Sequence, residues 1–488
     1  MRAFWIIGIA CSLCLSFACP SFAVTRYVDV SNATPASPFT NWGIASTNIQ
    51  MAINDAVSGD EILVAPGTYR LSGNPVLIPE DKTLTLRSTQ SRAAIIDAQK
   101  LSYGLWIRGS NSVVEGFTVR NGVNAAGSPG GVEITTACTV RDCLVTSNRA
   151  YGAGGIEIYA NGAVVENCTI QSNLATYFGG GVIFYGATAG LLQNCIVSDN
   201  IASNYGGGVF CQSAGTVSNC WISGNRSILE DGGGVYMSNQ GTTNGGTLIN
   251  SVVYSNRAGQ YGGGVYSVGP AGTLAPIINC TVVSNTAAQD GGGIFAYTTR
   301  LINNIIYGNS APTNANLNSN GSSSIVSNCC VTPAIGGAPT TNAPTFVDAV
   351  AQNFHLATAS SCIDAGTTNG APRNDIEGNP RPRIGKPGTS TTNCDVGAYE
   401  YGFHFNDIRF SNPNTVQLLW DVQDRGIYKL DVETNGTVSP PWIMGVAGYT
   451  NPSMASYQFM VHTQTIVIPA PVPADANFRL RISHTLGK

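Results

Sequence analysis

The sequence predicts an all-β parallel β-helix, because one short template recurs from about residue 115 to residue 330. Each repeat contains Gly-Gly-aliphatic, then Asn-Cys or a close variant, then aliphatic-x-x-Asn. Successive Asn-Cys elements are 24 to 31 residues apart, and a period of this size indicates a solenoid. Short β-branched runs separated by Gly and Asn, with no helical period, make each repeat one coil of short strands.

The asparagines that end each repeat are expected to stack, because equivalent residues of successive coils lie roughly 4.8 Å apart. A side-chain amide both donates and accepts hydrogen bonds, so the column predicts a continuous amide ladder. The paired glycines fit a turn that needs a positive φ or a close approach of backbones. The asparagines are Asn121, Asn148, Asn173, Asn200, Asn225, Asn256, Asn285 and Asn309.

Six cysteines share the Asn-Cys position and are expected inside the coils as free thiols. Parallel side chains in neighbouring coils leave Cβ atoms farther apart than a disulfide prefers, although some bridging is the alternative. A separate bridge is predicted between Cys362 and Cys394, which share one segment of a chain expected to be exported. The six are Cys143, Cys168, Cys195, Cys220, Cys280 and Cys329.

Residues 1–23 have the pattern of a secretory signal peptide, with Arg2, an apolar run and a small-x-small end at Ser21-Phe22-Ala23. We therefore expect a secreted protein, extracellular or at the cell surface. No later segment is long and apolar enough to span a membrane. The formal net charge of −4 argues against nucleic-acid binding, which needs a basic surface.

Four further parts follow the signal peptide. Residues 24–60 form an N-terminal lead-in with a capping helix, whose predicted N-cap is Asn48. Residues 61–345 form the coils, and residues 346–401 form a closing segment. Residues 404–488, with short strands and Pro-rich turns, are expected to form a small β-sandwich-like module.

Two stretches resemble known proteins. The opening, from Tyr27-Val28-Asp29 to Pro66-Gly67-Thr68-Tyr69, resembles right-handed parallel β-helix proteins of the pectin-lyase-like superfamily. The stretches Cys362-Ile363-Asp364-Ala365-Gly366 and Asp395-Val396-Gly397-Ala398-Tyr399-Glu400 are similar to the closing region of the choice-of-anchor Q type. The resemblance covers roughly residues 25–401 and implies a fold and an exported location rather than an activity.

Catalytic candidates lie just before the glycines. Polysaccharide lyases and hydrolases use this fold; hydrolysis needs two carboxyl groups, and β-elimination from a uronate needs a base and a cation. Asp231 and Asp290 occupy one template position, and Arg226 and Arg257 follow the asparagine column in successive repeats. A solvated rim of turns and ion pairs is the alternative.

A carbohydrate-binding stripe is predicted on the strand that follows each glycine pair. The residue after the inward aliphatic points outward, and flat aromatic rings at steps of about 4.8 Å suit stacking against sugars. A loop, the C-terminal module or another protomer covering the stripe is the alternative. The candidates are Glu133, Glu157, Phe210, Tyr236, Tyr266 and Phe295.

The sequence therefore predicts a secreted or cell-surface β-helix protein that binds a polysaccharide or cell-surface glycan. A lyase or glycoside hydrolase acting on an acidic glycan, and an adhesin or structural surface protein without catalysis, remain alternatives. No cofactor is expected, with calcium as the alternative at the acidic residues of the closing segment, such as Asp375 and Glu377. Whether the protein is an enzyme, and its oligomeric state, stay open.

Overall fold

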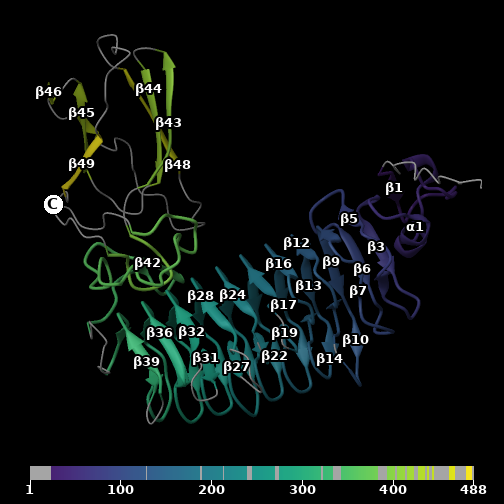
Figure 1. The fold of residues 1–488 in the computed structure, drawn as a ribbon, viewed down its shortest axis with the longest axis horizontal. Helices are drawn as coiled ribbons and strands as arrows, with labels where there is room; N and C mark the ends of the chain where they lie inside the picture. The colour runs from purple at the N-terminus through teal and green to yellow at the C-terminus, as the bar shows by residue number, and fades with distance from the viewer. Residues whose placement is uncertain are drawn as a thin grey trace, which may run out of the picture.

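The computed structural model describes residues 23–401, except 128, 187–188, 213, 239–244, 270–273, 320–322, 334–341 and 383–392, together with the backbone of strands between 404 and 485. Coils of short strands stack from the helix α1 (Ile49–Asp55) to the strand β39 (Ile325–Ser327), as Figure 1 shows. Along the repeats, each coil contributes one strand in turn to four sheets, which are named C, A, B and D and described below. All strands within these sheets pair in parallel. The predicted parallel β-helix is confirmed.

Two long sheets begin near the N-terminus. Sheet A contains β1 (Thr25–Val28), β2 (Glu61–Val64), β5 (Thr85–Ser88), β8 (Val113–Glu115), β12 (Thr139–Arg141), β16 (Val164–Glu166), β20 (Leu191–Gln193), β24 (Thr216–Ser218), β28 (Thr247–Ile249), β32 (Ala275–Ile278), β36 (Thr299–Ile302) and β39. Sheet B contains β3 (Gly67–Arg70), β6 (Ala94–Asp97), β9 (Phe117–Arg120), β13 (Leu144–Thr146), β17 (Thr169–Gln171), β21 (Ile196–Ser198), β25 (Trp221–Ser223), β29 (Val252–Tyr254), β33 (Thr281–Val283), β37 (Ile305–Tyr307) and β40 (Cys330–Val331).

The other two sheets flank the glycine turns. Sheet C contains β4 (Val76–Ile78), β7 (Leu105–Ile107), β11 (Val132–Ile134), β15 (Ile156–Ile158), β19 (Val182–Phe184), β23 (Val209–Cys211), β27 (Val235–Ser238), β31 (Val265–Val268), β35 (Ile294–Tyr297) and β38 (Leu317–Asn318). Sheet D contains β10 (Val123–Asn124), β14 (Arg149–Ala150), β18 (Leu174–Ala175), β22 (Ile201–Ala202), β26 (Arg226–Ser227), β30 (Arg257–Ala258) and β34 (Thr286–Ala287).

The remaining elements lie before and after the coils. A short 3-10 helix spans Trp42–Ile44, and the Asn48 side chain caps α1 by accepting from the Met51 N–H at 3.2 Å, as predicted. The closing segment contains the hairpin β41 (Phe346–Asp348) and β42 (Asn353–Leu356). Strands beyond it pair antiparallel: β43 (His404–Asn412), β44 (Thr415–Asp421), β45 (Ile427–Thr434), β46 (Thr437–Val438), β47 (Trp442–Met444), β48 (Val461–Val467) and β49 (Leu480–Thr485).

The predicted asparagine ladder is confirmed from Asn148 onward. Asn225 is typical, because its Nδ2 donates to Asn256 Oδ1 at 3.0 Å and to the Val197 carbonyl at 2.8 Å. Its Oδ1 accepts the backbone N–H and the Nδ2 of Asn200, each at 3.0 Å. The ladder therefore satisfies buried backbone groups as well as its own amides.

Asn121 is the exception. It lies one residue too early, at a φ of 56°, and donates to Asp97, while the Gly122 N–H reaches Asn148 Oδ1 at 2.8 Å. At the other end the ladder extends to Asn316, which accepts from Asn309 at 3.1 Å. The template thus located the ladder and misplaced only its first step.

Glycine is required where sheet D passes behind the turn. A Cβ on Gly233 would lie 2.4 Å from the carbonyl carbon of Arg257, so no other residue fits without moving the backbone. Gly232, directly before it, has a φ of 68°. The close approach and the left-handed turn therefore belong to different glycines of one triplet.

The cysteine column is buried and unbridged, as predicted. The Cys143 and Cys168 N–H groups each donate to the thiol of the next coil at 3.4 Å, while each column thiol donates to the carbonyl two residues before it. The predicted Cys362–Cys394 bridge is wrong. Both thiols are free, because the Cys394 thiol instead donates to the Thr367 carbonyl at 3.0 Å.

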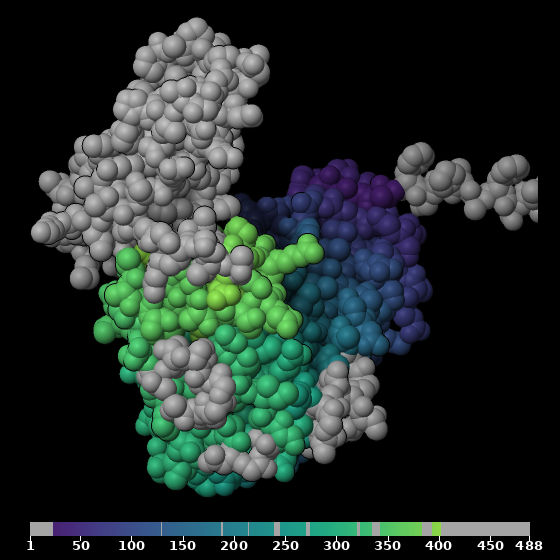
Figure 2. Space-filling view, turned by 60° about the vertical axis from the view of Figure 1, so that its left-hand side comes forward, coloured from purple at the N-terminus to yellow at the C-terminus, as the bar shows by residue number. Residues whose placement is uncertain are grey.

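The closing segment lies along the flank of the last coils. Its apolar residues Phe354, Ile363 and Val396 form a second core with Val252 and Ile305 on the outer face of sheet B. Figure 2 shows residues of this segment covering the surface of the C-terminal coils. Among the described residues, the solenoid therefore has a main core inside the coils and a second core beneath the closing segment.

We predict that Asn225→Ala lowers the free energy of unfolding by about 3 kcal/mol or more. The substitution leaves the buried amide and N–H of Asn200 without their acceptor, and each unmet buried group costs about 1–3 kcal/mol. Denaturant unfolding followed by circular dichroism measures the effect. Asn204→Ala, at the half-buried rim of the preceding coil, is the control and should unfold like the parent; equal stability of both variants would contradict the ladder's role.

Candidate functional site

The outer face of sheet C carries the predicted stripe. Val209 and Cys211 lie in the main core, whereas Phe210 between them belongs to a separate cluster outside it. Val235 and Tyr236 divide in the same way. The predicted inward and outward faces are therefore confirmed, and one outward residue of each coil sits above the next.

Five rings form what we call the aromatic ladder. Successive rings are nearly parallel, with interplanar angles of 8° to 15° and centroid distances of 4.9 to 5.2 Å. One strand spacing, about 4.8 Å, nearly equals the stacking distance of two rings, so each coil places its ring on the ring of the coil before. In order, the ladder is Phe178, Phe210, Tyr236, Tyr266 and Phe295.

Stacking changes what the ladder offers to a ligand. Phe210 and Tyr236 are only 5% and 9% exposed, so the expectation of open ring faces is wrong for these two. Tyr266 and Phe295 are half-buried. The ring faces lie against one another along the solenoid axis, and a ligand meets ring edges instead.

A second set of rings, which we call the tyrosine rim, borders the ladder where the chain enters each glycine turn; it consists of Tyr151, Tyr177, Tyr205 and Tyr261. Tyr151 and Tyr177 stack at 5.4 Å and are 44% and 36% exposed. Tyr177 contacts Phe178 at 4.9 Å, and Tyr205 contacts Tyr236 at the same distance. The stripe predicted from the sequence did not include Tyr151 and Tyr177, because they lie outside the strands. Their positions shortly before the glycines are the signal that could have identified them.

Asp231 lies within this aromatic surface. It shares a column with Tyr205 and Tyr261 and is 7% exposed, with one carboxyl oxygen accepting the Tyr261 N–H at 3.1 Å. Burial raises the pKa of Asp231 to about 7, and the neighbouring Glu230 charge adds to the rise. A carboxyl group that exchanges its proton near neutral pH is suited to acid–base chemistry.

Asp290 does not join Asp231. Tyr261 lies between them in the column, so their backbones are two coil spacings, roughly 10 Å, apart. Two amides hold the Asp290 carboxylate, Asn314 at 2.9 Å and Asn318 at 2.6 Å. The two acids share a template position, but Asp231 is buried beside Tyr261, whereas two asparagine amides hold Asp290.

Arg226 and Arg257 lie elsewhere. They pair in register on β26 and β30 of sheet D, where both are exposed. Within the residues that the structure describes, no ion pair joins either arginine to Asp231 or Asp290. The described residues therefore show no contact between the acids and the arginines of the expected patch.

The N-terminal end of the same face is more polar. Trp106, Glu133 and Glu157 follow one another in register, and Glu157 is buried. Burial raises the pKa of Glu133, while a hydrogen bond from Tyr103 and the charge of Arg108 oppose the rise.

Arg108 also lies 4.9 Å from the Trp106 ring centre and pairs with Glu80 at 2.7 Å. The repeat template begins after this coil, so counting repeats missed Tyr103, Trp106 and Arg108. Extending the coil period backward by one repeat would have found them.

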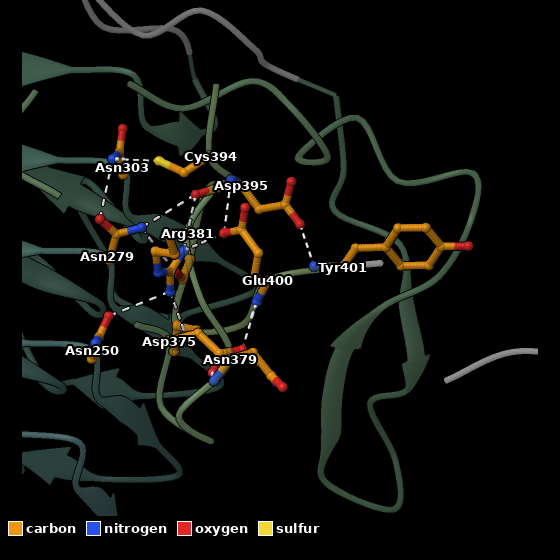
Figure 3. Close-up of polar contacts among 12 residues, drawn as sticks. Asn250, Asn279, Asn303, Asp375, Asn379, Arg381, Cys394, Asp395, Glu400 and Tyr401 are labelled. Atoms are coloured by element: carbon orange, nitrogen blue, oxygen red, sulfur yellow. Dashed lines mark hydrogen bonds and ion pairs between the residues drawn. The ribbon is translucent and has the colours of Figure 1, made fainter. Parts of the chain in front are cut away.

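Acidic residues of the closing segment form structural hydrogen bonds and an ion pair (Figure 3). The buried Arg381 pairs with Glu400 at 2.8 Å, and Asp375 accepts the N–H groups of Glu377 and Asn379 at 2.9 and 2.8 Å. Burial, with the neighbouring Glu400, raises the pKa of Asp395. In the described part of the chain no group of three or more His, Cys, Asp or Glu side chains is arranged to hold a metal ion.

Asparagine side chains attach this segment to the coils (Figure 3). Asn279 donates to the Asp395 and Gly397 carbonyls, each at 3.2 Å, and Asn303 donates to Thr367 at 2.8 Å. Both are the left-handed asparagines of the Asn-Cys template, with φ of 51° and 56°. The turns that follow strands β32 and β36 of sheet A therefore direct their asparagine amides toward the closing segment.

The raised pKa of Asp231 makes stability depend on pH. Below the unfolded pKa of about 4 the carboxyl is neutral in both states; between pH 4 and 7 the unfolded state ionises first, so folding stability falls as pH rises. Asp231→Asn should therefore gain stability over the parent across that range, by at most about 4 kcal/mol. Thermal melts from pH 4 to 8 test this, with Asp290→Asn as control; parallel pH profiles for Asp231→Asn and the parent would refute it.

Comparisons with known proteins agree with this architecture. A family model described as a right-handed β-helix region matches residues 103–287. The pectate lyase Pel9A aligns with a TM-score of 0.55 at 16% identity, covering 78% of this chain and 97% of that one. A PL6 polysaccharide lyase from Pseudopedobacter saltans aligns at 0.38 and 14% identity, over 72% and 97% of the two chains. No curated protein matches. The chain is a right-handed parallel β-helix of the kind seen in Pel9A.

Proposed function

We propose that this protein binds polysaccharide along the outer face of sheet C. The observation that carries the proposal is one continuous aromatic surface: the ladder and the tyrosine rim join nine rings through ring contacts. Aromatic rings pack against the apolar faces of sugars, and tyrosine hydroxyls and carboxyl groups fix their orientation. The rings are Tyr151, Tyr177, Phe178, Tyr205, Phe210, Tyr236, Tyr261, Tyr266 and Phe295.

The surface suits an elongated ligand. Its rings repeat at one coil spacing along the axis, and it continues into the polar end with Trp106, Arg108 and Glu133. A chain of sugars crossing several coils would meet tyrosine edges at one end and a tryptophan with charged neighbours at the other. We place the main contact on the solvent-facing rings Tyr151 and Tyr177 rather than on the buried middle of the ladder.

The proposal also places the protein outside the cell, secreted or at the surface, as the choice-of-anchor Q resemblance implies. Its support is the signal-peptide pattern of residues 1–23, most of which lie outside the described structure. Among the described residues no helix is both long and apolar enough to cross a membrane.

Catalysis on an acidic glycan is the second candidate, and Asp231 is the observation that favours it. Its pKa of about 7 suits a general acid or base. Asp290 lies two coils from Asp231, and among the described residues no ion pair joins Arg226 or Arg257 to Asp231. Binding therefore has the stronger support. An adhesive surface protein would likewise bind a glycan without converting it.

Incubation of the purified protein with uronic-acid and neutral glycans separates the candidates. Retention on a glycan without new products supports binding. Absorbance from unsaturated uronates identifies a lyase, and new reducing ends identify a hydrolase. No retention of any glycan in a broad panel would contradict the proposal.

For the rim, we predict that Tyr151→Ala combined with Tyr177→Ala weakens glycan affinity at least tenfold. Each exposed ring contributes about 1 kcal/mol of stacking, and about 1.4 kcal/mol corresponds to tenfold in affinity. Isothermal titration with the retained glycan measures the change. Trp42→Ala, an equally exposed ring away from this face, should bind normally; unchanged affinity in the rim variant would remove the rim from the site.

For the ladder, we predict that Tyr236→Ala mainly destabilises the fold, by about 3 kcal/mol. The ring is buried between Phe210 and Tyr266, so its removal leaves a cavity. Tyr236→Phe keeps the ring and should restore most of the stability. Denaturant titration of the three proteins decides, and parent-like stability of Tyr236→Ala would show that the stack carries little energy.

A further inference from the structure

Two adjacent cysteines end the last coil and face opposite ways. Cys329 continues the inner column and lies in the main core. Cys330 follows in β40, paired with Ile305 of β37, and lies in the second core outside sheet B. Both are fully buried. Alternation along one strand therefore gives one thiol to each core.

The closing segment places a third cysteine against Cys330. Cys362 is fully buried in the same second core, and its thiol lies close enough to that of Cys330 for the two groups to interact. Backbone contacts fix the Cys362 end, because its carbonyl accepts the Val396 N–H at 3.0 Å and its N–H donates to Ser360. The Cys330 thiol also reaches the Asn342 carbonyl at 3.2 Å.

This pair differs from the inner column. Column thiols project in parallel from stacked coils, which is unfavourable for a bridge. Cys330 belongs to the solenoid and Cys362 to the segment packed on it, so the two thiols approach from opposite sides of one interface. The third cysteine of that region, Cys394, is turned toward Thr367 and Asn303 instead.

We propose that Cys330 and Cys362 form a disulfide when the protein meets a disulfide-containing oxidant, such as an oxidised dithiol protein or oxidised glutathione. A thiolate of one cysteine attacks the oxidant disulfide and releases one of its sulfurs as a thiol. The second cysteine then attacks the mixed disulfide and releases the other. Two thiols of this chain are oxidised, and one disulfide of the oxidant is reduced to two thiols.

The bridge would tie the closing segment to the last coil. The segment is otherwise held by the second core and by side-chain amides such as those of Asn279 and Asn303. A covalent link across this interface restricts local opening of the segment, since cross-links act largely by limiting the open state. An oxidising compartment would therefore stabilise the flank of the solenoid, a property independent of glycan binding.

Peptide mapping of the full chain tests the proposal. The folded protein is equilibrated with oxidised glutathione, then unfolded in excess alkylating agent without reductant and digested. The expected result is a linked pair of peptides containing Cys330 and Cys362, with Cys329 and the column cysteines alkylated. Alkylation of both Cys330 and Cys362 after oxidation, or a Cys362–Cys394 link, would overturn the assignment.

Variants add a second readout. Oxidation should raise the thermal midpoint of the parent and of Cys394→Ser by several degrees, and a reductant should reverse the change. Cys330→Ser and Cys362→Ser should melt alike with and without oxidant. A rise that persists in Cys362→Ser would contradict the proposal; if either variant fails to fold, the mapping of the parent decides alone.

Discussion

The spacing of about 4.8 Å between coils governs this molecule, because it places equivalent side chains directly above one another. Asparagine amides repeat at that step and bond in an unbroken row inside the coils, from Asn148 to Asn316. The thiol column follows the same rule, and Ser251 and Asn304 serve as acceptors where the cysteine is replaced. One constraint thus converts a sequence repeat into rows of like interactions.

The same spacing determines what the outer face of sheet C offers to a ligand. Aromatic rings one coil apart are already at stacking distance, so Phe210, Tyr236 and Tyr266 stack on one another and leave little of their ring faces open to a ligand. A ladder of this kind stabilises the sheet and presents edges rather than faces. The chemistry left for a partner lies at its borders, on the rim tyrosines and around Trp106 and Glu133, where the stacking ends.

The sequence predicted the rows well and their surroundings poorly. The repeat located the amide ladder, the thiol column and the alternation of Val209 and Phe210, because each depends on position within the coil alone. It placed Asp231 and Asp290 at one template position on the same ground, but Tyr261 lies between them and the amides of Asn314 and Asn318 hold Asp290 alone. It also missed Trp106 and Arg108, which precede the first full repeat.

The closing segment shows why position in a repeat does not fix the role of a residue. Asn194 and Asn219 occupy the left-handed turn position and bond to each other at 3.2 Å on the surface. One coil on, Asn250 holds the same position, yet it is buried and donates to the Asn374 carbonyl at 2.6 Å. The turn chemistry is identical, and only the segment packed outside differs. A row of outward amides is therefore a general attachment surface, and what the chain lays over it decides which coils use it.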